Sequence, residues 1–164
     1  MDISRITSRV FVSSWPKQGE SATLRELGIR LVISVTMREP LPEFRAEPFE
    51  WIQLRALDSP LTPIPLENLH RGVLAAIPVL AAGHGVLCHC REGRHRSVAM
   101  ACSILIAQGC SAARAAEVVK ERRPVADPTA FWIAPRISKF EHAWLGGWRE
   151  EAHVPAGALE PNCG

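Results

Sequence analysis

The chain has 164 residues, of which 47% are hydrophobic and 22% charged, and a formal net charge of +2. This size and composition predict one soluble globular domain with its own core, and the small charge without a Lys/Arg run gives no indication of nucleic-acid binding. No run approaches about 18 apolar residues and the first residues lack an apolar signal core, so we expect no membrane span and a cytoplasmic protein. Five cysteines, an odd number, argue against a secreted disulfide framework.

The pattern along the chain alternates between strands and helices. In chain order we predict a strand over 3–13, a helix over 22–27, a strand over 29–35, an exposed loop over 37–50, a strand over 51–54, an irregular segment over 55–65, a helix over 66–82 kinked at Pro78, a strand over 86–89, and helices over 98–108, 112–122 and 130–145. This alternation predicts an α/β fold with a central, mostly parallel sheet of four or five strands and helices on both faces. We expect residues 1–145 to form the folded domain and residues 146–164 a flexible tail.

The most informative stretch is residues 85–97. A short apolar strand ends at His89 and Cys90, a loop containing Gly93 follows, and a helix pattern opens at Arg96 and Ser97. Strand, loop and helix N-terminus together direct backbone N–H groups at one point, where an anion can bind. We therefore predict a phosphate-binding loop with a cysteine nucleophile at its centre.

A free thiol is only a few per cent ionised at neutral pH, so this loop has to stabilise the thiolate. Loop amides, the charge of Arg96 and an orienting hydrogen bond from His89 are available for this, and the Ser97 hydroxyl can donate to the sulfur and help it leave. The planar guanidinium of Arg96 can grip two phosphate oxygens, and Gly93 permits a turn that a Cβ would hinder.

An acid for this site is predicted from topology. Sites on parallel sheets gather beyond the carboxyl ends of strands, and the segment 55–65 follows one strand just as the cysteine loop follows another. Of the three aspartates in the chain, only Asp58 lies in such a loop. We therefore expect Asp58 to meet Cys90.

Residues 89–97, His-Cys-Arg-Glu-Gly-Arg-His-Arg-Ser, resemble the His-Cys-x-x-Gly-x-x-Arg-Ser/Thr signature of cysteine-dependent protein tyrosine phosphatases, and more closely that of small, atypical dual-specificity phosphatases. The resemblance extends over residues 3–145, through strands at 6–13 and 27–35, an acid loop at 56–60 and a C-terminal segment at 123–131. It implies a catalytic domain over 1–145 that hydrolyses phosphotyrosine and phosphoserine/phosphothreonine in proteins through a cysteinyl-phosphate.

The resemblance also assigns roles to residues. Cys90 would attack phosphorus, and Asp58 would protonate the leaving oxygen and then serve as base for water. His89, Arg96 and Ser97 complete the catalytic set, and no metal or cofactor is implied. The phosphate would be held by the loop residues Arg91, Glu92, Gly93, Arg94, His95 and Arg96.

The sequence also departs from the family pattern. Thr129 stands where an asparagine is common, and the helix after the loop has Cys102-Ser103-Ile104 in the region where a tyrosine is usual. The loop interior is unusually basic at Arg91, Arg94 and His95. Loops of the form x-x-Gly-Lys-His-Arg occur in phosphatases that resemble this family and prefer inositol pyrophosphates. A small polyanionic substrate, such as an inositol polyphosphate, an inositol pyrophosphate or a phosphoinositide, is therefore an open alternative to a phosphoprotein, unless these arginines simply point to solvent.

The cysteines and histidines near the loop also allow different interpretations. They could form a metal cluster, although their spacing does not match common zinc patterns. A rhodanese-like sulfurtransferase and a non-catalytic phospho-binding module also use such a loop. Cys88 or Cys102 could trap an oxidised Cys90 as a disulfide, or could be buried small hydrophobic residues. Glu92 could act as a second acid or order the loop, and the sequence gives no indication of the oligomeric state. The residues of the possible metal cluster are His84, Cys88, His89, Cys90 and His95.

Overall fold

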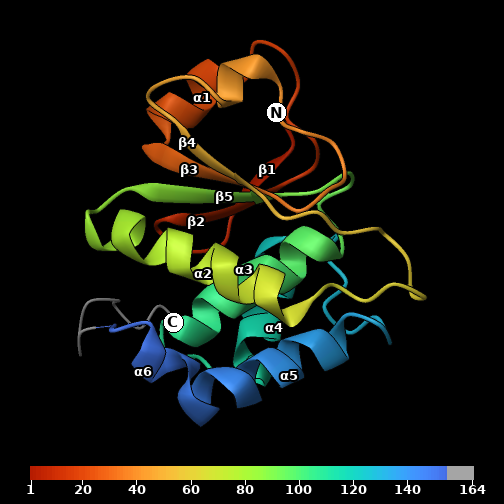
Figure 1. Cartoon of the computed structure of the whole chain (residues 1–164). Helices are drawn as coiled ribbons and strands as arrows, with labels where there is room; N and C mark the ends of the chain where they lie inside the picture. The colour runs from red at the N-terminus through yellow and green to blue at the C-terminus, as the bar shows by residue number, and fades with distance from the viewer. Residues whose placement is uncertain (155–164) are drawn as a thin grey trace.

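The computed structural model describes residues 1–154 and contains a five-stranded sheet with helices on both faces (Figure 1). The strand order is β1-β2-β5-β3-β4, which makes β5 central. Strands β2, β5, β3 and β4 are parallel, and β1 pairs antiparallel with β2. The predicted α/β class and mostly parallel sheet are confirmed. The bounds are β1 (Ile3–Arg5), β2 (Val10–Ser13), β3 (Ile29–Ser34), β4 (Glu50–Gln53) and β5 (Gly85–His89).

The strand predicted over 3–13 is in fact two strands joined by a tight turn. The Thr7 hydroxyl oxygen accepts hydrogen bonds from the backbone N–H groups of Arg9 (3.3 Å) and Val10 (3.0 Å). Threonine side chains that bond to nearby backbone in this way stabilise turns. Apolar residues lie on both sides of the turn, at Ile3 and Ile6 before it and from Val10 after it, so the sequence pattern alone reads as one strand.

Helix α1 covers one face of the sheet, while α2, α3, α4 and α5 lie on the other (Figure 1). Helix α3 is the central one, since every residue from Arg96 to Ile106 is buried. A helix that is apolar on all sides is expected to lie inside the protein. Pro78, expected to kink its helix, lies within α2. The bounds are α1 (Ser21–Glu26), η1 (Pro42–Phe44), α2 (Leu66–Ala81), α3 (Arg96–Ala107), α4 (Ala112–Arg122), α5 (Ala134–Ala143), η2 (Trp144–Trp148) and α6 (Arg149–Glu151).

The two faces of the sheet bury separate cores. In β5, Val86 and Cys88 belong to the large core beneath α2–α5, whereas Leu87 points into the small core beside α1, as the two-residue period of a strand requires. The segment 37–50 was expected to be an exposed loop, and this is wrong in part. Phe44 and Phe49 are buried in the small core because the short α1 alone leaves that face of the sheet incompletely covered.

The last helix begins later and extends further than the pattern predicts. It begins at Ala134 because residues 127–133 form turns, and helical segments follow through η2 and α6 to Glu151, with a kink at Gly147, whose φ is +145°. The Trp148 ring stacks on His70 of α2, with centroids 4.2 Å apart and an angle of 11°. Helical structure thus continues past the boundary expected at 145, and the remainder of the expected tail, residues 155–164, lies outside the described residues.

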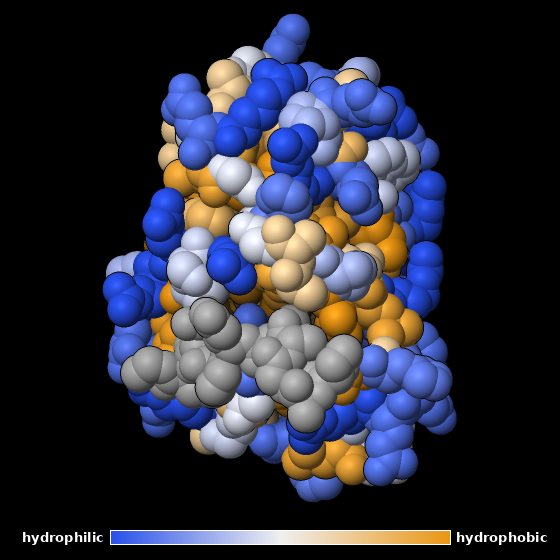
Figure 2. All heavy atoms as spheres, turned by 90° about the vertical axis from the view of Figure 1, so that its left-hand side faces the viewer, coloured by the Kyte–Doolittle hydropathy of each residue, from blue (hydrophilic) through white to orange (hydrophobic). Residues whose placement is uncertain are grey.

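The parallel strands end together at one edge of the sheet. Ser13, Ser34 and His89 are register partners at the carboxyl ends of β2, β3 and β5, and Gln53 pairs with Ser34 at the end of β4. The loops that follow β4 and β5 therefore leave the sheet on the same side, on the right of Figure 1. Figure 2 shows the opposite side, on which hydrophilic and hydrophobic side chains are mixed.

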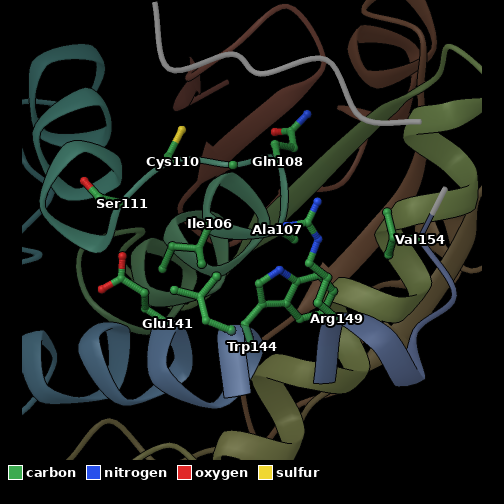
Figure 3. A pocket seen from close by; sticks show the side chains of 11 residues that line it. Ile106, Ala107, Gln108, Cys110, Ser111, Glu141, Trp144, Arg149 and Val154 are labelled. Carbon is green, nitrogen blue, oxygen red and sulfur yellow. The ribbon is translucent and has the colours of Figure 1, made fainter. Parts of the chain in front are cut away.

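A hollow of about 350 Å³ lies at the C-terminal end of α3, remote from this edge (Figure 3). Glu141, Trp144 and Arg149 reach toward it from the C-terminal helices. The Glu141 carboxylate accepts a 2.7 Å hydrogen bond from the Ala112 backbone N–H at the start of α4, so it ties α5 to α4. This hollow contains none of the residues predicted to carry the chemistry.

Candidate active site

The loop between β5 and α3 is wrapped around the sulfur of Cys90. We call residues 90–96 the Cys90 loop. The Gly93 backbone N–H donates to Sγ at 3.2 Å, and the Ser97 Oγ lies 3.2 Å from the same atom. Cys90 is almost completely buried, at 1% exposure. The cysteine predicted to be the nucleophile therefore lies where a backbone N–H and a hydroxyl converge on its sulfur.

Gly93 is required by both the backbone and the surrounding space. Its φ is +64°, and a Cβ here would lie 2.5 Å from a guanidinium nitrogen of Arg123 and 2.6 Å from the carbonyl of Ser13. No ordinary side chain fits between these groups. The predicted role of this glycine in the turn agrees with the structure.

Arg123 is a site residue that sequence reasoning missed. It is 1% exposed, its Nε donates to the Gly93 carbonyl at 2.7 Å, and its Nη2 donates to Asp2 at 2.8 Å. The same nitrogen lies 3.4 Å from the Glu92 carbonyl. The Asp2 pKa is lowered to about 2, chiefly by this hydrogen bond. Arg123 thus supports the Cys90 loop through the carbonyl groups of the loop. Its position after α4, in a segment that resembles the family, was the one sequence feature that could have indicated this role.

Asp58, which was expected to meet Cys90, lies against Arg96 of the Cys90 loop. The Arg96 side chain is buried, its Nη2 lies 3.3 Å from Asp58 Oδ2, and its Nη1 donates to the Ala56 carbonyl at 2.9 Å. Arg96 Nε is buried with no hydrogen-bond partner in the described part of the chain, which leaves a donor for an incoming anion. The acid loop expected at residues 56–60 is therefore tied directly to the Cys90 loop.

His89 lies at the site but makes no hydrogen bond to the Cys90 sulfur. Its ring is buried, neither ring nitrogen has a well-formed hydrogen bond within residues 1–154, and the ring packs edge-on against Trp15 at 5.4 Å. Burial lowers the pKa of His89 to about 4; the Arg96 charge acts in the same direction, and the Cys90 backbone opposes it. A neutral imidazole thus supports the strand end by packing.

The remaining residues of the Cys90 loop have different surroundings in the structure. Arg91 is exposed at the mouth of the active-site pocket. Glu92 is exposed and contributes its carbonyl to Arg123. Arg94 is directed to Asp127, with 3.5 Å between Nη2 and Oδ2, and its carbonyl accepts from the Asp127 N–H at 2.9 Å. Thr129, at the position where asparagine was expected, bonds to Asp127 at 3.1 Å.

The active-site pocket has a volume of about 470 Å³, within the ~300–1,000 Å³ typical of small-molecule sites. Besides Asp58 and Arg96, its walls include five residues that sequence reasoning missed and one that it named. These are Trp15, Thr36, Met37, Arg38 and Leu57, together with Arg91. The missed residues come from loops after three different strands, so no local motif marks them.

The other cysteines near the site are buried and unreactive in character. Burial raises the pKa of the Cys88 thiol strongly and that of Cys102 to about 12. Both therefore stay protonated, which favours the interpretation as buried small hydrophobic residues.

Among the described residues, no group of three or more His, Cys, Asp or Glu side chains is arranged to hold a metal ion, so the possible metal cluster around Cys88 does not form. Within the same range, the longest apolar helices fall short of what a membrane crossing needs.

The fold and the site together define a cysteine-dependent phosphatase: a thiol at the end of a central strand, an amide-lined loop and an arginine at the start of a buried helix. Residues 10–135 match the family model described as "Dual specificity phosphatase, catalytic domain". The chain belongs to the dual specificity phosphatase family. Its enzyme class is that of the dual specificity protein phosphatases, which are phosphoric monoester hydrolases.

Known relatives agree with this assignment. The chain is 30% identical to Dual specificity phosphatase 28 of Homo sapiens, over 96% of this chain and 88% of the relative. It is 29% identical to Dual specificity protein phosphatase 14 of Homo sapiens, over 79% of this chain and 65% of that protein. The crystal structure of human DUSP28 superposes with a TM-score of 0.78 at 27% identity, covering 88% of this chain and 96% of that one.

Proposed function

We propose that this phosphatase works in two steps through Cys90. In the first, Sγ attacks phosphorus, the S–P bond forms as the P–O bond to the leaving group breaks, and Asp58 gives its proton to the leaving oxygen. In the second, the Asp58 carboxylate takes a proton from water as the water oxygen attacks phosphorus, and the S–P bond breaks to release phosphate and the thiolate. The observation that carries this proposal is the 3.3 Å contact that joins Asp58 to Arg96 of the Cys90 loop.

The Cys90 loop supplies the binding half of this mechanism. Loop N–H groups and the Arg96 guanidinium would hold the equatorial oxygens of the phosphoryl group. These hydrogen bonds strengthen as negative charge builds up on the oxygens during phosphoryl transfer. The unpartnered Nε of Arg96 supports this role. Ser97, 3.2 Å from Sγ, would donate to the departing thiolate in the second step.

The first candidate substrates are phosphotyrosine, phosphoserine and phosphothreonine in proteins, as the family membership favours. The test is phosphate release from matched peptides by the wild type, Cys90→Ser and Asp58→Ala. We expect Cys90→Ser to abolish turnover, and Asp58→Ala to lower kcat by about 10²-fold, since a positioned acid contributes ~10²–10⁴-fold. A fully active Cys90→Ser variant would refute the nucleophile assignment.

A small polyanion is the second candidate, and the pocket walls favour it. Arg38 and Arg91 are exposed, line the same pocket as Arg96, and make no ion pair within residues 1–154. Asp58 is the one carboxylate among the described lining residues, and Trp15 gives an apolar wall. PTPMT1, solved in complex with PI(5)P, has a similar fold, with a TM-score of 0.79 at 23% identity.

The two candidates are separated by kcat/KM on peptides, phosphoinositide vesicles, inositol polyphosphates and inositol pyrophosphates. If a polyanion is the substrate, Arg38→Ala and Arg91→Ala should each lower kcat/KM for it by about tenfold, since a charge-assisted contact contributes ~1.5–3 kcal/mol. Hydrolysis of a simple aryl phosphate should change little. Arg94→Ala is the matched control, because Arg94 is engaged with Asp127. Equal losses on all substrates would argue against a polyanion.

A further inference from the structure

His95 faces the acid of the proposed mechanism. It is the residue immediately before Arg96, at the N-cap of α3. Its Nδ1 lies 3.7 Å from Asp58 Oδ1, while Arg96 Nη2 lies 3.3 Å from Asp58 Oδ2. Each oxygen of the Asp58 carboxyl group therefore faces a nitrogen of the Cys90 loop, one from each of two consecutive residues.

The imidazole is held in place from its other side. The Trp132 ring packs against His95 with centroids 4.9 Å apart, tilted by 53°. Trp132 is itself packed against the large core, in the turns before α5. That segment is tied to the Cys90 loop by the hydrogen bond from the Asp127 N–H to the Arg94 carbonyl, at 2.9 Å. The His95 side chain is 19% exposed, so it has little freedom to move away from Asp58.

Asp58 needs such support because its own loop provides little. The acid loop has no regular structure, and its neighbours Leu57 and Leu61 are 50% and 89% exposed. When a phosphoryl group binds, its oxygens would compete with Asp58 for the Arg96 guanidinium, which would weaken the contact between Arg96 and Asp58. His95 is then the remaining Cys90-loop side chain in contact with the carboxyl group.

We propose that His95 is a positioning residue that keeps Asp58 over the leaving oxygen once Arg96 is engaged by the phosphate. Trp132 acts behind it by fixing the ring. This inference rests on the proposed function, in which Asp58 is the acid. It assigns a role to a residue that the loop signature leaves variable.

The test compares leaving groups, because protonation by an acid matters most when the leaving oxygen is strongly basic. The substrates are p-nitrophenyl phosphate, which has a good leaving group, and phenyl phosphate, which has a poor one. For His95→Ala we expect kcat/KM to fall about tenfold on phenyl phosphate, since a misplacement of 1 Å can cost up to ~10²-fold, and less than twofold on p-nitrophenyl phosphate. His95→Asn, whose amide N–H can replace Nδ1, should recover most of the loss.

Two further variants keep the test decisive. In an Asp58→Asn background, His95→Ala should cause no additional leaving-group-dependent loss, because the group that it positions is absent. Trp132→Leu should reproduce the phenyl phosphate defect in part. His84→Ala, an exposed histidine in the turn before β5, is the control and should leave both rates unchanged.

The outcomes separate this inference from the proposed function. Equal losses on both substrates for His95→Ala, full additivity with Asp58→Asn, or no loss at all would overturn the positioning role. If Asp58→Asn itself shows no dependence on the leaving group, the acid assignment fails and the inference fails with it. If Asp58→Asn behaves as an acid variant and His95→Ala does not, only the inference fails.

Discussion

At the scale of single residues, the sulfur of Cys90 is the point on which the neighbouring groups converge. The Gly93 amide and the Ser97 hydroxyl lie at 3.2 Å, one from the middle of the loop and one from the first turn of α3. Because α3 is buried along its length, these groups are held rigidly, and little reorganisation is needed when charge develops.

The Ser97 contact leads to a kinetic prediction. Ser97→Ala removes a donor to the departing thiolate, so breakdown of the cysteinyl-phosphate should slow by about 10–10²-fold while its formation changes little. Rapid-mixing measurements with p-nitrophenyl phosphate should then show a burst of nitrophenol followed by a slow steady state. Ser103→Ala, in the same helix with its hydroxyl bonded to the Ala99 carbonyl, is the control and should show no burst. Absence of a burst in Ser97→Ala would contradict this role.

Gly93 leads to a second prediction at this scale. Gly93→Ala combines a positive φ with a Cβ that would lie only 2.5–2.6 Å from Arg123 and Ser13, so it should lower the free energy of unfolding by more than about 2 kcal/mol and abolish activity. Gly109→Ala is a matched control, since its φ is +101° and nothing lies within 4 Å of its Cβ position. Urea unfolding of both variants isolates the cost of the steric clash at residue 93. Equal losses of unfolding free energy in the two variants would contradict a contribution from this clash.

At the scale of elements, the Cys90 loop is braced by segments from both ends of the chain. Arg123, after α4, connects the Gly93 carbonyl to Asp2, which lies immediately before β1. The Trp15 N–H, after β2, donates to the Arg91 carbonyl at 3.2 Å. The loop conformation is therefore maintained by contacts distant in sequence.

This brace can be tested with Arg123→Met. The change leaves the Gly93 carbonyl without its buried partner, so we expect the free energy of unfolding to fall by about 2 kcal/mol and kcat to fall with it. Arg122→Met, the exposed neighbouring position, serves as the control and should alter neither quantity substantially. An Arg123→Met protein with wild-type stability and rate would show that the brace is dispensable.

At the scale of the whole molecule, the sheet brings two loops to one edge and buries a neutral histidine beneath them. The pKa of His89 is about 4 in the folded protein, against 6.5 for an unperturbed histidine, because the ring is buried. Between these pH values the unfolded chain binds a proton that the folded protein does not. Stability therefore falls as the pH decreases from about 6.5 to 4.

The expected loss is about 3.5 kcal/mol, from a pKa difference of about 2.5 at ~1.4 kcal/mol per pH unit. Urea unfolding from pH 7 to 4 should show it, and His89→Gln should flatten the curve in this window. Below pH 4 a second loss should follow as Asp2, whose pKa is about 2, is protonated and its bond to Arg123 weakens. His142→Gln, at an exposed histidine, should leave the curve unchanged; a flat wild-type curve would contradict the prediction.

Much of the site could be predicted from local patterns in the sequence. One continuous strand–loop–helix segment contains Cys90, Gly93, Arg96 and Ser97. Their spacing already determines that backbone amide and hydroxyl groups converge on the sulfur. That the segment of Asp58 lies at the same edge of the sheet as the Cys90 loop was also predictable, because parallel strands place their following loops at the same edge.

The remaining features required the tertiary structure, because they depend on register and packing between distant segments. Arg94 and Arg91 are equivalent in the sequence, yet the turn near Asp127 engages one and leaves the other in the pocket. No pattern around Arg123 distinguishes a buried brace from an exposed helix end. The sequence by itself determined the Cys90 loop and the α/β class of the fold, since both follow from local spacing and periodicity; only tertiary contacts decided what supports the loop, lines the pocket and faces Asp58.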